Sequence, residues 1–490
     1  RPTSFSVISP NATNTATGGT PFFKAGTTPF GLDAASKTNT TPLTNYTGTA
    51  KINSGRIAAH PGAVQAGSVD GVFSPATSAS GISKGMAFTY SEVGNFQFLP
   101  WGVYDDGSFA DVDRGKATPE CFIDGKLGSA IVPADPNVKD GNGKYGCYFG
   151  GTKPPTSSNT SGGATASSLF FGRFIPDHFL VTAGTTKPAC APPGATNPFT
   201  YFGQDFTTEF TLTAQNASGN TTQNYDGNIG YAKLPLTAWG AAPAPGFGFA
   251  VGTWSPAQPA GTPAAVLANS ATADTAPTPT ATNSNTWSAG TTTVTARHMI
   301  VRPTSAPAVP TTITVTALPV DSDGVTTLPV TPSTTPSPTL ISSTLLLQRF
   351  GRLRLIPGQG SNLAPFKMQT EVQYWDGTYW RTNVADSCTT LASGNFAVSG
   401  TTGTTASTAA GISQGYGSIL LTRPTSVGTA TICMDMATTA NDCTVTTPPN
   451  LGYLLGGPAY NTDPSATVFF GGASSNSRGN WGYLYRRENF

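Results

Sequence analysis

Apolar and polar residues alternate along many short stretches of this chain. Residues 208–215 (TEFTLTAQ), 311–318 (TTITVTAL) and 351–357 (GRLRLIP) each show this period of two. It is typical of a strand with one face in a core and the other in solvent. No window of twelve or more residues carries an apolar stripe at helical spacing. The pattern predicts an all-β chain of short strands and Gly/Pro-rich turns, which is typical of β-sandwiches.

Two segments carry the same set of residues in the same order and at similar spacing. Such a repeat predicts two related immunoglobulin-like sandwiches in tandem. We expect the tyrosine that closes each copy to pack its ring and bond its hydroxyl locally, as tyrosine corners do. The matched positions are Pro2 and Pro176, Phe5 and Phe179, Phe30 and Phe210, Leu32 and Leu212, and the Asn-Tyr-x-Gly motifs at 45–48 and 224–227.

The repeat and the composition together predict the domain organisation. We expect the stretch 171–179 (FGRFIPDHF) to open the second sandwich, and residues 85–106 to form the final hairpin of the first. Residues 373–380 (QYWDGTYW) predict a hairpin with Asp-Gly at its turn. The expected order is a sandwich at 1–115, a disulfide-stapled Gly/Ser/Thr-rich insertion at 116–170, a sandwich at 171–328, a Pro/Thr linker at 329–340 and a C-terminal β domain at 341–490.

Charge is scarce and balanced. Charged residues make up 10% of the 490 residues, with 26 basic and 25 acidic side chains and a net charge of +1, against about 25% in typical soluble domains. With a net charge of +1, the chain has no strong positive electrostatic potential of the kind that attracts nucleic acid or an anionic membrane. The chain shows neither a signal peptide nor a membrane span and opens without Met, so we expect a processed or partial form of a longer precursor.

Six cysteines indicate an oxidising compartment, because the count is even and no pair has CxxC spacing. Cys121 with Cys147 and Cys433 with Cys443 are the near-neighbour pairings, which leaves Cys190 with Cys388. Fifteen connectivities are open for six cysteines, so spacing alone does not decide among them.

The sequence offers few candidate catalytic residues. Only three histidines are present, so zinc sites and nucleophile–His–acid sets have few candidates: His60, His178 and His298. Asp177 precedes His178, but neighbours on a strand point to opposite faces, and we expect no side-chain hydrogen bond between them. For Glu92 and Glu488 we expect an ion pair or a bond to backbone N–H. We predict no catalytic residues and no cofactor.

Two binding chemistries remain as candidates. Calcium takes several oxygen ligands from Gly-containing loops, and residues 105–113 supply Asp105, Asp106, Asp111 and Asp113. Asp-Gly is also an ordinary turn former. Sugar could stack on Trp375, Tyr379 or Trp380, but core packing competes for at least one of these aromatic side chains.

Several strings together resemble one family. They are FTYSEVGNF, GRFIPDHF, NYDG, DSDGV, FGRLRL, QYWDGTYW with DSC, and YRRENF. The chain resembles the C-terminal region of MshQ-like proteins, which are encoded with the MSHA (mannose-sensitive haemagglutinin) type IV pilus system of Gram-negative bacteria. The resemblance implies an exported, cell-surface protein associated with pili, and it supplies no catalytic residues.

Three functions are therefore carried forward. The first is a non-enzymatic surface protein acting in adhesion or appendage assembly, with pilus components as partners. The second is a repeating subunit of an extracellular filament that associates with itself, since low charge reduces repulsion between stacked subunits. The third is a glycan-binding or glycan-active protein with a surface glycan as ligand.

Overall fold

Strands account for almost all of the regular structure, and the expected all-β fold of tandem sandwiches with a C-terminal β domain is confirmed. No α-helix occurs in the part of the chain that the computed structural model describes; only two 3-10 turns do, η1 (Ser393–Asn395) and η2 (Gly452–Leu454). The described residues are 4–38, 41–99, 102–105, 167–236, 245–261, 286–303, 306–329, 333–436, 443, 445 and 449–471, with the backbone of four short strands at 121–122, 145–146, 152–153 and 267–269.

The first sandwich uses two sheets around an aromatic core. Among the described residues its core holds eleven phenylalanine and tyrosine side chains in edge-to-face, tilted and stacked contacts, and Phe30, Phe96 and Phe174 lie at the centre. One sheet has the order β13 (Thr152–Lys153), β1 (Ser4–Ile8), β3 (Phe30–Thr38), β8 (Ile82–Tyr90) and β7 (Val69–Asp70), with β4 (Thr41–Pro42) on β3; the other has β2 (Phe23–Lys24), β14 (Phe171–Ile175), β9 (Gly94–Phe98) and β6 (Ile57–Ala59). Separate two-stranded pairs join β10 (Val103–Tyr104) to β5 (Lys51–Ile52), and β11 (Cys121–Phe122) to β12 (Tyr145–Gly146).

The second sandwich shows the period-two pattern most clearly. Strand β17 alternates buried and half-buried side chains along its whole length, and β21 does the same. One sheet has the order β15 (His178–Lys187), β17 (Asp205–Gln215), β20 (Thr291–Ile300) and β19 (Leu267–Asn269); the other has β16 (Phe199–Tyr201), β23 (Leu346–Arg349), β21 (Thr311–Val320) and β18 (Gly246–Ser255), with β22 (Thr339–Leu340) on β21.

The third sandwich follows directly from the last strand of the second. The predicted hairpin is present, because Trp375 pairs with Trp380 around a turn at Asp376 and Gly377. One sheet has the order β24 (Gly351–Leu355), β26 (Phe366–Trp375), β30 (Tyr416–Leu421) and β29 (Ala406–Ser413), with β27 (Trp380–Thr382) on β26; the other has β25 (Gly358–Ser361), β32 (Ser465–Gly471), β31 (Gly428–Met434) and β28 (Phe396–Gly400).

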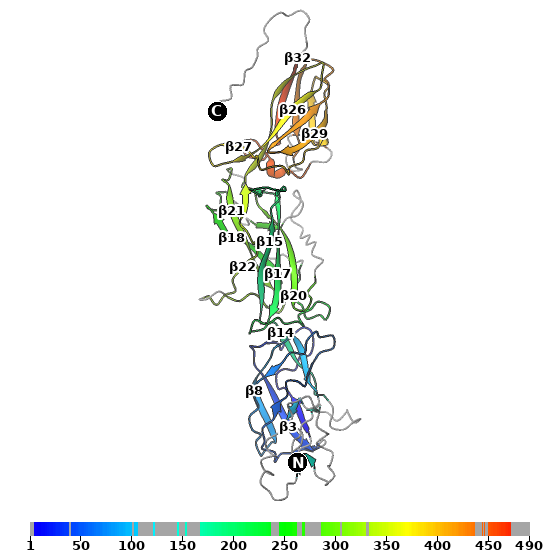
Figure 1. The fold of residues 1–490 in the computed structure, drawn as a ribbon, viewed down its shortest axis with the longest axis vertical. Coiled ribbons are helices and arrows are strands. Elements are labelled where there is room, and N and C mark those ends of the chain that lie inside the picture. Colours follow the sequence, from blue (N-terminus) through cyan, green and yellow to red (C-terminus); the bar gives the residue numbers. More distant parts are fainter. Residues whose placement is uncertain are drawn as a thin grey trace, which may run out of the picture.

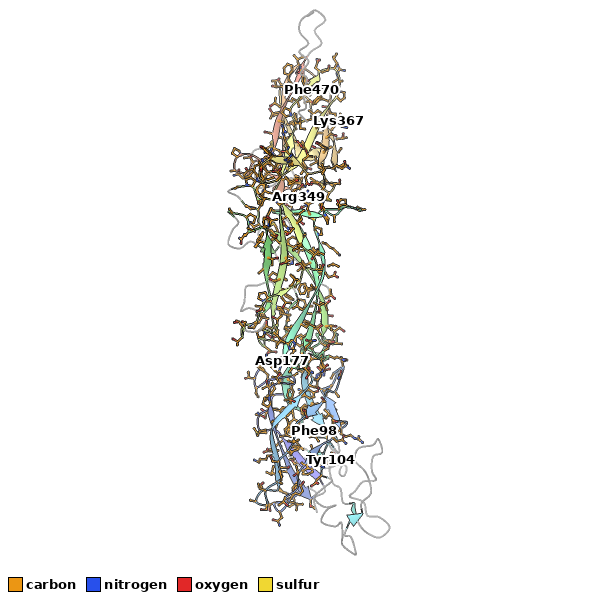
Figure 2. All side chains as sticks on the ribbon, turned by 60° about the vertical axis from the view of Figure 1, so that its left-hand side comes forward. Phe98, Tyr104, Asp177, Arg349, Lys367 and Phe470 are labelled. Atoms are coloured by element: carbon orange, nitrogen blue, oxygen red, sulfur yellow. A yellow bond between two sulfur atoms is a disulfide. The ribbon has the colours of Figure 1, made fainter. Side chains whose placement is uncertain are left out.

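The three sandwiches follow one another along one axis in sequence order, so the described chain is a rod (Figure 1). Asp177 lies where the first sandwich meets the second, and Arg349 where the second meets the third (Figure 2). Each sandwich has a separate hydrophobic core. Core residues cross both boundaries, however: Val93 and Ile175 of the first sandwich join the second core, and Cys190, Phe199 and Tyr201 of the second join the third.

Two sequence expectations about the first boundary are wrong. Residues 171–175 do not open the second sandwich, because β14 pairs with β9 and β2, and its Phe171 and Phe174 rings pack into the first core. The second sandwich starts at His178 instead. Residues 85–106 form no hairpin: β8 and β9 belong to opposite sheets, and the turn between them crosses the sandwich end at residues 91–93.

Candidate functional site

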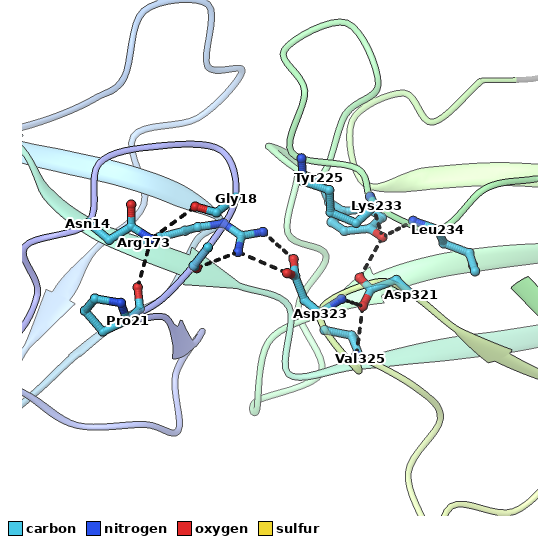
Figure 3. A network of polar contacts seen from close by, with 11 residues as sticks. Asn14, Gly18, Pro21, Arg173, Tyr225, Lys233, Leu234, Asp321, Asp323 and Val325 are labelled. Carbon is cyan, nitrogen blue, oxygen red and sulfur yellow. Dashed lines mark hydrogen bonds and ion pairs between the residues drawn. The ribbon is translucent and has the colours of Figure 1, made fainter. Parts of the chain in front are cut away.

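The junctions between sandwiches gather most of the buried polar residues that the sequence singled out. Each junction is built around the same local structure, which we call the corner. It consists of a strand residue, a turn later in the chain, and the glycine that precedes the neighbouring strand of the same sheet. In the second sandwich Tyr225 closes the corner. Its hydroxyl donates to Asp321 Oδ2 at 3.0 Å and accepts the N–H groups of Lys233 and Leu234. Figure 3 shows this group.

The expected tyrosine corners therefore exist in both copies of the repeat, although their partner is an aspartate rather than nearby backbone alone. In the first sandwich Tyr46 donates its hydroxyl to Asp105. Asp105 directly follows the two-residue strand β10, and Asp321 directly follows the ten-residue strand β21. Burial raises the pKa of Asp321 to about 6, and hydrogen bonds from Val325 N–H and the Tyr225 hydroxyl limit the rise.

Asn224, beside this tyrosine, locks the second sandwich to the first. Its Oδ1 accepts the N–H groups of Val64 at 2.8 Å and Gln65 at 3.1 Å. Its Nδ2 donates to the carbonyls of Gln65 at 2.8 Å and Val93 at 3.2 Å. The side chain is fully buried. All four hydrogen-bonding sites of one amide are thus used across the boundary.

Glu92 completes the lock from the other side. It is 2% exposed, and its carboxylate accepts the N–H groups of Gln223 at 3.0 Å and Asn224 at 3.2 Å, together with that of Val93. Burial raises the pKa of the Glu92 carboxyl to about 7, and these three backbone donors hold it from rising further. The expectation that Glu92 bonds backbone N–H agrees with these contacts.

Arg173 forms an ion pair across the same junction. Arg173 is 1% exposed, and its guanidinium donates to both carboxylate oxygens of Asp323 in a bidentate ion pair (Figure 3). Its Nη1 also donates to the Gly19 carbonyl at 3.2 Å. Asp323 lies two residues after Asp321, so one turn serves both the tyrosine and the boundary.

The neighbouring residues Asp177 and His178 also lie at this junction. Thr27 donates its hydroxyl to Asp177 Oδ1 at 2.6 Å, and Lys24 Nζ donates to the Asp177 carbonyl. Contrary to expectation, His178 Nδ1 lies 3.0 Å from Asp177 Oδ2. Asp177 precedes β15 rather than lying within it, so the alternation rule does not apply. The other ring nitrogen of His178 meets Gln215 Oε1, which is no nucleophile.

The second junction is covalent. The Cys190–Cys388 disulfide joins a loop of the second sandwich to the third across 198 residues of sequence. Beside it, the buried Tyr201 hydroxyl donates to Asp386 Oδ2 at 2.9 Å and accepts from Asn383 Nδ2. The second disulfide, Cys433–Cys443, lies inside the third sandwich. The side chains of Cys121 and Cys147 lie outside the described residues.

Arg302 forms the other half of this junction. It donates three hydrogen bonds of 2.8–3.0 Å to the carbonyls of Gly351, Gly452 and Leu455 in the third sandwich, and its guanidinium stacks on Phe350. Burial lowers the Arg302 pKa to about 9. An arginine with its donors directed at three carbonyls fixes the angle between the sandwiches.

The aromatic residues considered for sugar binding divide between two roles. Trp375 and Trp380 pack against the end of the second core and against each other, and Trp380 also contacts the rings of Phe350 and Tyr460. Tyr379 at the hairpin tip is 64% exposed.

Of the aspartates considered for calcium, Asp105 is buried against Tyr46; Asp106, Asp111 and Asp113 lie outside the described residues. Within the described ranges, no group of three metal-ligating side chains comes together.

The sequence did not indicate Asn224 or Arg302 as junction residues. The repeat contains a signal for Asn224, since Asn precedes Tyr in both copies, but asparagine at such a position is also an ordinary turn former. Arg302 carries no motif at all.

The fold and the junctions define a class of protein: a rod of β-sandwiches whose boundaries are locked by buried polar contacts and a disulfide. Two domain models of one family match this chain. The third domain of DUF6701 matches residues 137–339, and the fourth domain of DUF6701 matches residues 349–489. Together they cover more than half of the chain, which therefore belongs to the DUF6701 family.

Two solved structures show a distant likeness. The Escherichia coli adhesin FdeC is 9% identical, with 95% of this chain and 96% of that chain covered at a TM-score of 0.32. The Yersinia pseudotuberculosis adhesin InvE is 11% identical, with 54% of each chain covered at a TM-score of 0.15. At these values neither likeness supports a conclusion about function. No curated protein matches the chain.

Proposed function

We propose that this chain is the stiff stalk of an exported, non-enzymatic cell-surface protein that acts in adhesion or in the assembly of a surface appendage. The observation that carries the proposal is the pair of locked junctions. Three sandwiches joined by Asn224, Arg173, Arg302 and a disulfide form a rod whose segments cannot swing independently. Domains within a chain otherwise move by default.

A further observation supports this role. Disulfides persist in oxidising compartments, which suits export. The described part of the chain contains no helix long and apolar enough to cross a membrane. The finer assignment, to an MshQ-like protein of a Gram-negative MSHA pilus system, rests on the short strings quoted above and on membership of the DUF6701 family.

The three histidines favour a non-enzymatic role. His298 is fully buried and bonds Thr208 at 2.8 Å, and burial lowers its pKa to about 3. His60 stacks on Tyr231 at the first junction, and His178 meets Asp177 and Gln215. Each histidine has a structural partner, and Thr208, the partner of His298 that carries a hydroxyl, is fully buried together with that ring.

Two alternatives keep specific support. A filament subunit would need complementary ends, and the rod shape with low net charge suits end-to-end stacking. Glycan binding would use the exposed Tyr379 together with Tyr416, which is 52% exposed. Calcium binding by residues 105–113 stays a prediction.

Electron microscopy of native material, with the cell surface intact, tests the proposal. Gold labels on the first and third sandwiches should lie at two distinct heights above the outer membrane, because a stiff stalk holds its ends apart. Labels at equal heights would contradict the proposal that the chain is a stiff stalk. Regular fibres with this chain as their repeating unit would favour the filament alternative, and labels confined to pilus tips would fix the pilus association.

A further inference from the structure

The corner is the same hydrogen-bonded structure in all three sandwiches. The backbone N–H of a strand residue donates to the carbonyl of the corner glycine. The carbonyl of the same strand residue accepts the N–H of the first turn residue. The carbonyl of that first turn residue accepts the N–H of the residue three positions later. The glycine is required, because a Cβ on Gly290 would lie 2.3 Å from the Thr222 carbonyl and one on Gly81 would lie 1.8 Å from that of Leu43. The matched sets are Ala214, Gly290, Thr222 and Tyr225 in the second sandwich, Val372, Gly415, Asn383 and Asp386 in the third, and Ser36, Gly81, Leu43 and Tyr46 in the first.

In the second and third sandwiches, this corner is where the preceding sandwich docks. Gln223 and Asn224 of the second corner bond Glu92, Val64 and Gln65 of the first sandwich. Asn383 and Asp386 of the third corner bond Tyr201, and Asn383 also accepts from Arg349. The same local structure therefore performs the same task twice, with different side chains.

The first sandwich carries the corner at its end remote from the second. Thr44 and Asn45 stand where Gln223 and Asn224 stand in the second corner, between the turn residue and the tyrosine. Asn224 is fully buried, whereas Thr44 and Asn45 are exposed. No hydrogen bond from either N–H group, or from the Asn45 amide, is found among the described residues.

We propose that this first corner is a docking surface for a further β domain. That domain would present a turn like residues 91–93, with a carboxylate that accepts the N–H groups of Thr44 and Asn45 and a backbone that pairs with the Asn45 amide. The inference rests on the repeated corner alone and is independent of what the rod adheres to.

Hydrogen exchange tests the docking surface on the protein as it exists. Peptides that span residues 41–52 are followed in native cell-surface material and in the purified 490-residue chain. We expect exchange at Thr44 and Asn45 to be at least about tenfold slower in the native material, because a docked partner must open before these amides exchange. Equal rates in the two preparations would overturn the proposal.

Matched variants identify the side chain responsible. Asn45→Ala should restore fast exchange of this segment in native material, while Thr47→Ala, an exposed neighbour outside the corner, should leave the protection intact. Peptides from β17 report whether each variant is folded. Protection that persists on dilution places the partner in the same polypeptide, and protection lost on dilution places it in another molecule. Protection that survives in Asn45→Ala would reject the corner as the docking element.

Discussion

At the residue scale, single buried polar groups decide how the sandwiches are joined. Beside the apolar side chains of Val93 and Ile175, the first boundary holds an amide with four partners, a carboxylate with three backbone donors and a bidentate arginine. Such groups are costly when left unpaired, because they have already lost their hydration. Removing one partner should therefore weaken a junction more than the pair's own net stabilisation suggests.

Replacing Asn224 with Ala should destabilise the first junction by about 2–4 kcal/mol, because the Val64 and Gln65 N–H groups and two carbonyls lose their partner. Urea unfolding measures the loss. Asn220→Ala, an exposed asparagine on the same loop, is the matched control and should change stability by less than about 0.5 kcal/mol. Equal effects of the two variants would contradict the amide's role.

Glu92 should make the junction less stable as pH rises. Its pKa is about 7 in the folded chain against 4.5 in a free side chain, so between these values the folded state holds a proton that the unfolded state has lost. The free energy of unfolding should fall with pH across that window, by at most about 1.4 kcal/mol per pH unit. Glu92→Gln should reduce the dependence of the free energy of unfolding on pH. Urea unfolding of both proteins at pH 5 and pH 8 measures this dependence. A slope unchanged by the substitution would exclude Glu92 as its source.

At the scale of elements, the sequence predicted strands well and boundaries poorly. The period of two located β17, β21 and β24, because one face of each strand is buried. The end of the first sandwich was misplaced, because residues 171–175 are buried on both faces and their pattern does not say which sheet they join. The turn at 91–93 looked like a hairpin, since a crossing between sheets and a hairpin use the same turn residues.

The corner glycine is the element-scale feature most open to test. Gly290 has a φ of +76°, and a Cβ there would meet the Thr222 carbonyl at 2.3 Å. Gly290→Ala should destabilise the second sandwich by about 2 kcal/mol or more, through left-handed backbone and steric contact. Thermal unfolding measures it. Gly248→Ala, where a Cβ would have 3.8 Å of room, is the control, and a comparable loss there would refute the corner's special requirement.

At the scale of the whole molecule, the candidate site could be predicted only in part. The Asn-Tyr-x-Gly repeat pointed to the corners, and the cysteine count indicated disulfides. The partners of Asn224 lie 131–160 residues away in sequence, and those of Arg302 lie 49–153 residues away. Contacts of that kind depend on how two finished sandwiches meet, which no local pattern encodes.

The Cys190–Cys388 disulfide should keep the rod straight. Cys190→Ala with Cys388→Ala should broaden the distribution of end-to-end distances in small-angle X-ray scattering, because the second junction then relies on non-covalent contacts alone. Removing the Cys433–Cys443 bridge, whose separation is only 10 residues within one sandwich, should leave that distribution unchanged. A straight rod in both double variants would show that the polar contacts suffice.

The same disulfide has a mechanical consequence. If the chain is pulled by its two ends, tension passes from Cys190 directly to Cys388 through the sulfur–sulfur bond. The residues between them, separated by 198 positions in sequence, are bypassed and carry no load. At about 3.4 Å per extended residue, roughly 670 Å of chain cannot be drawn out while the bond is intact. Most of the second sandwich would therefore keep its fold under forces that stretch the first, and the length of an appendage built from this chain would be limited by covalent chemistry.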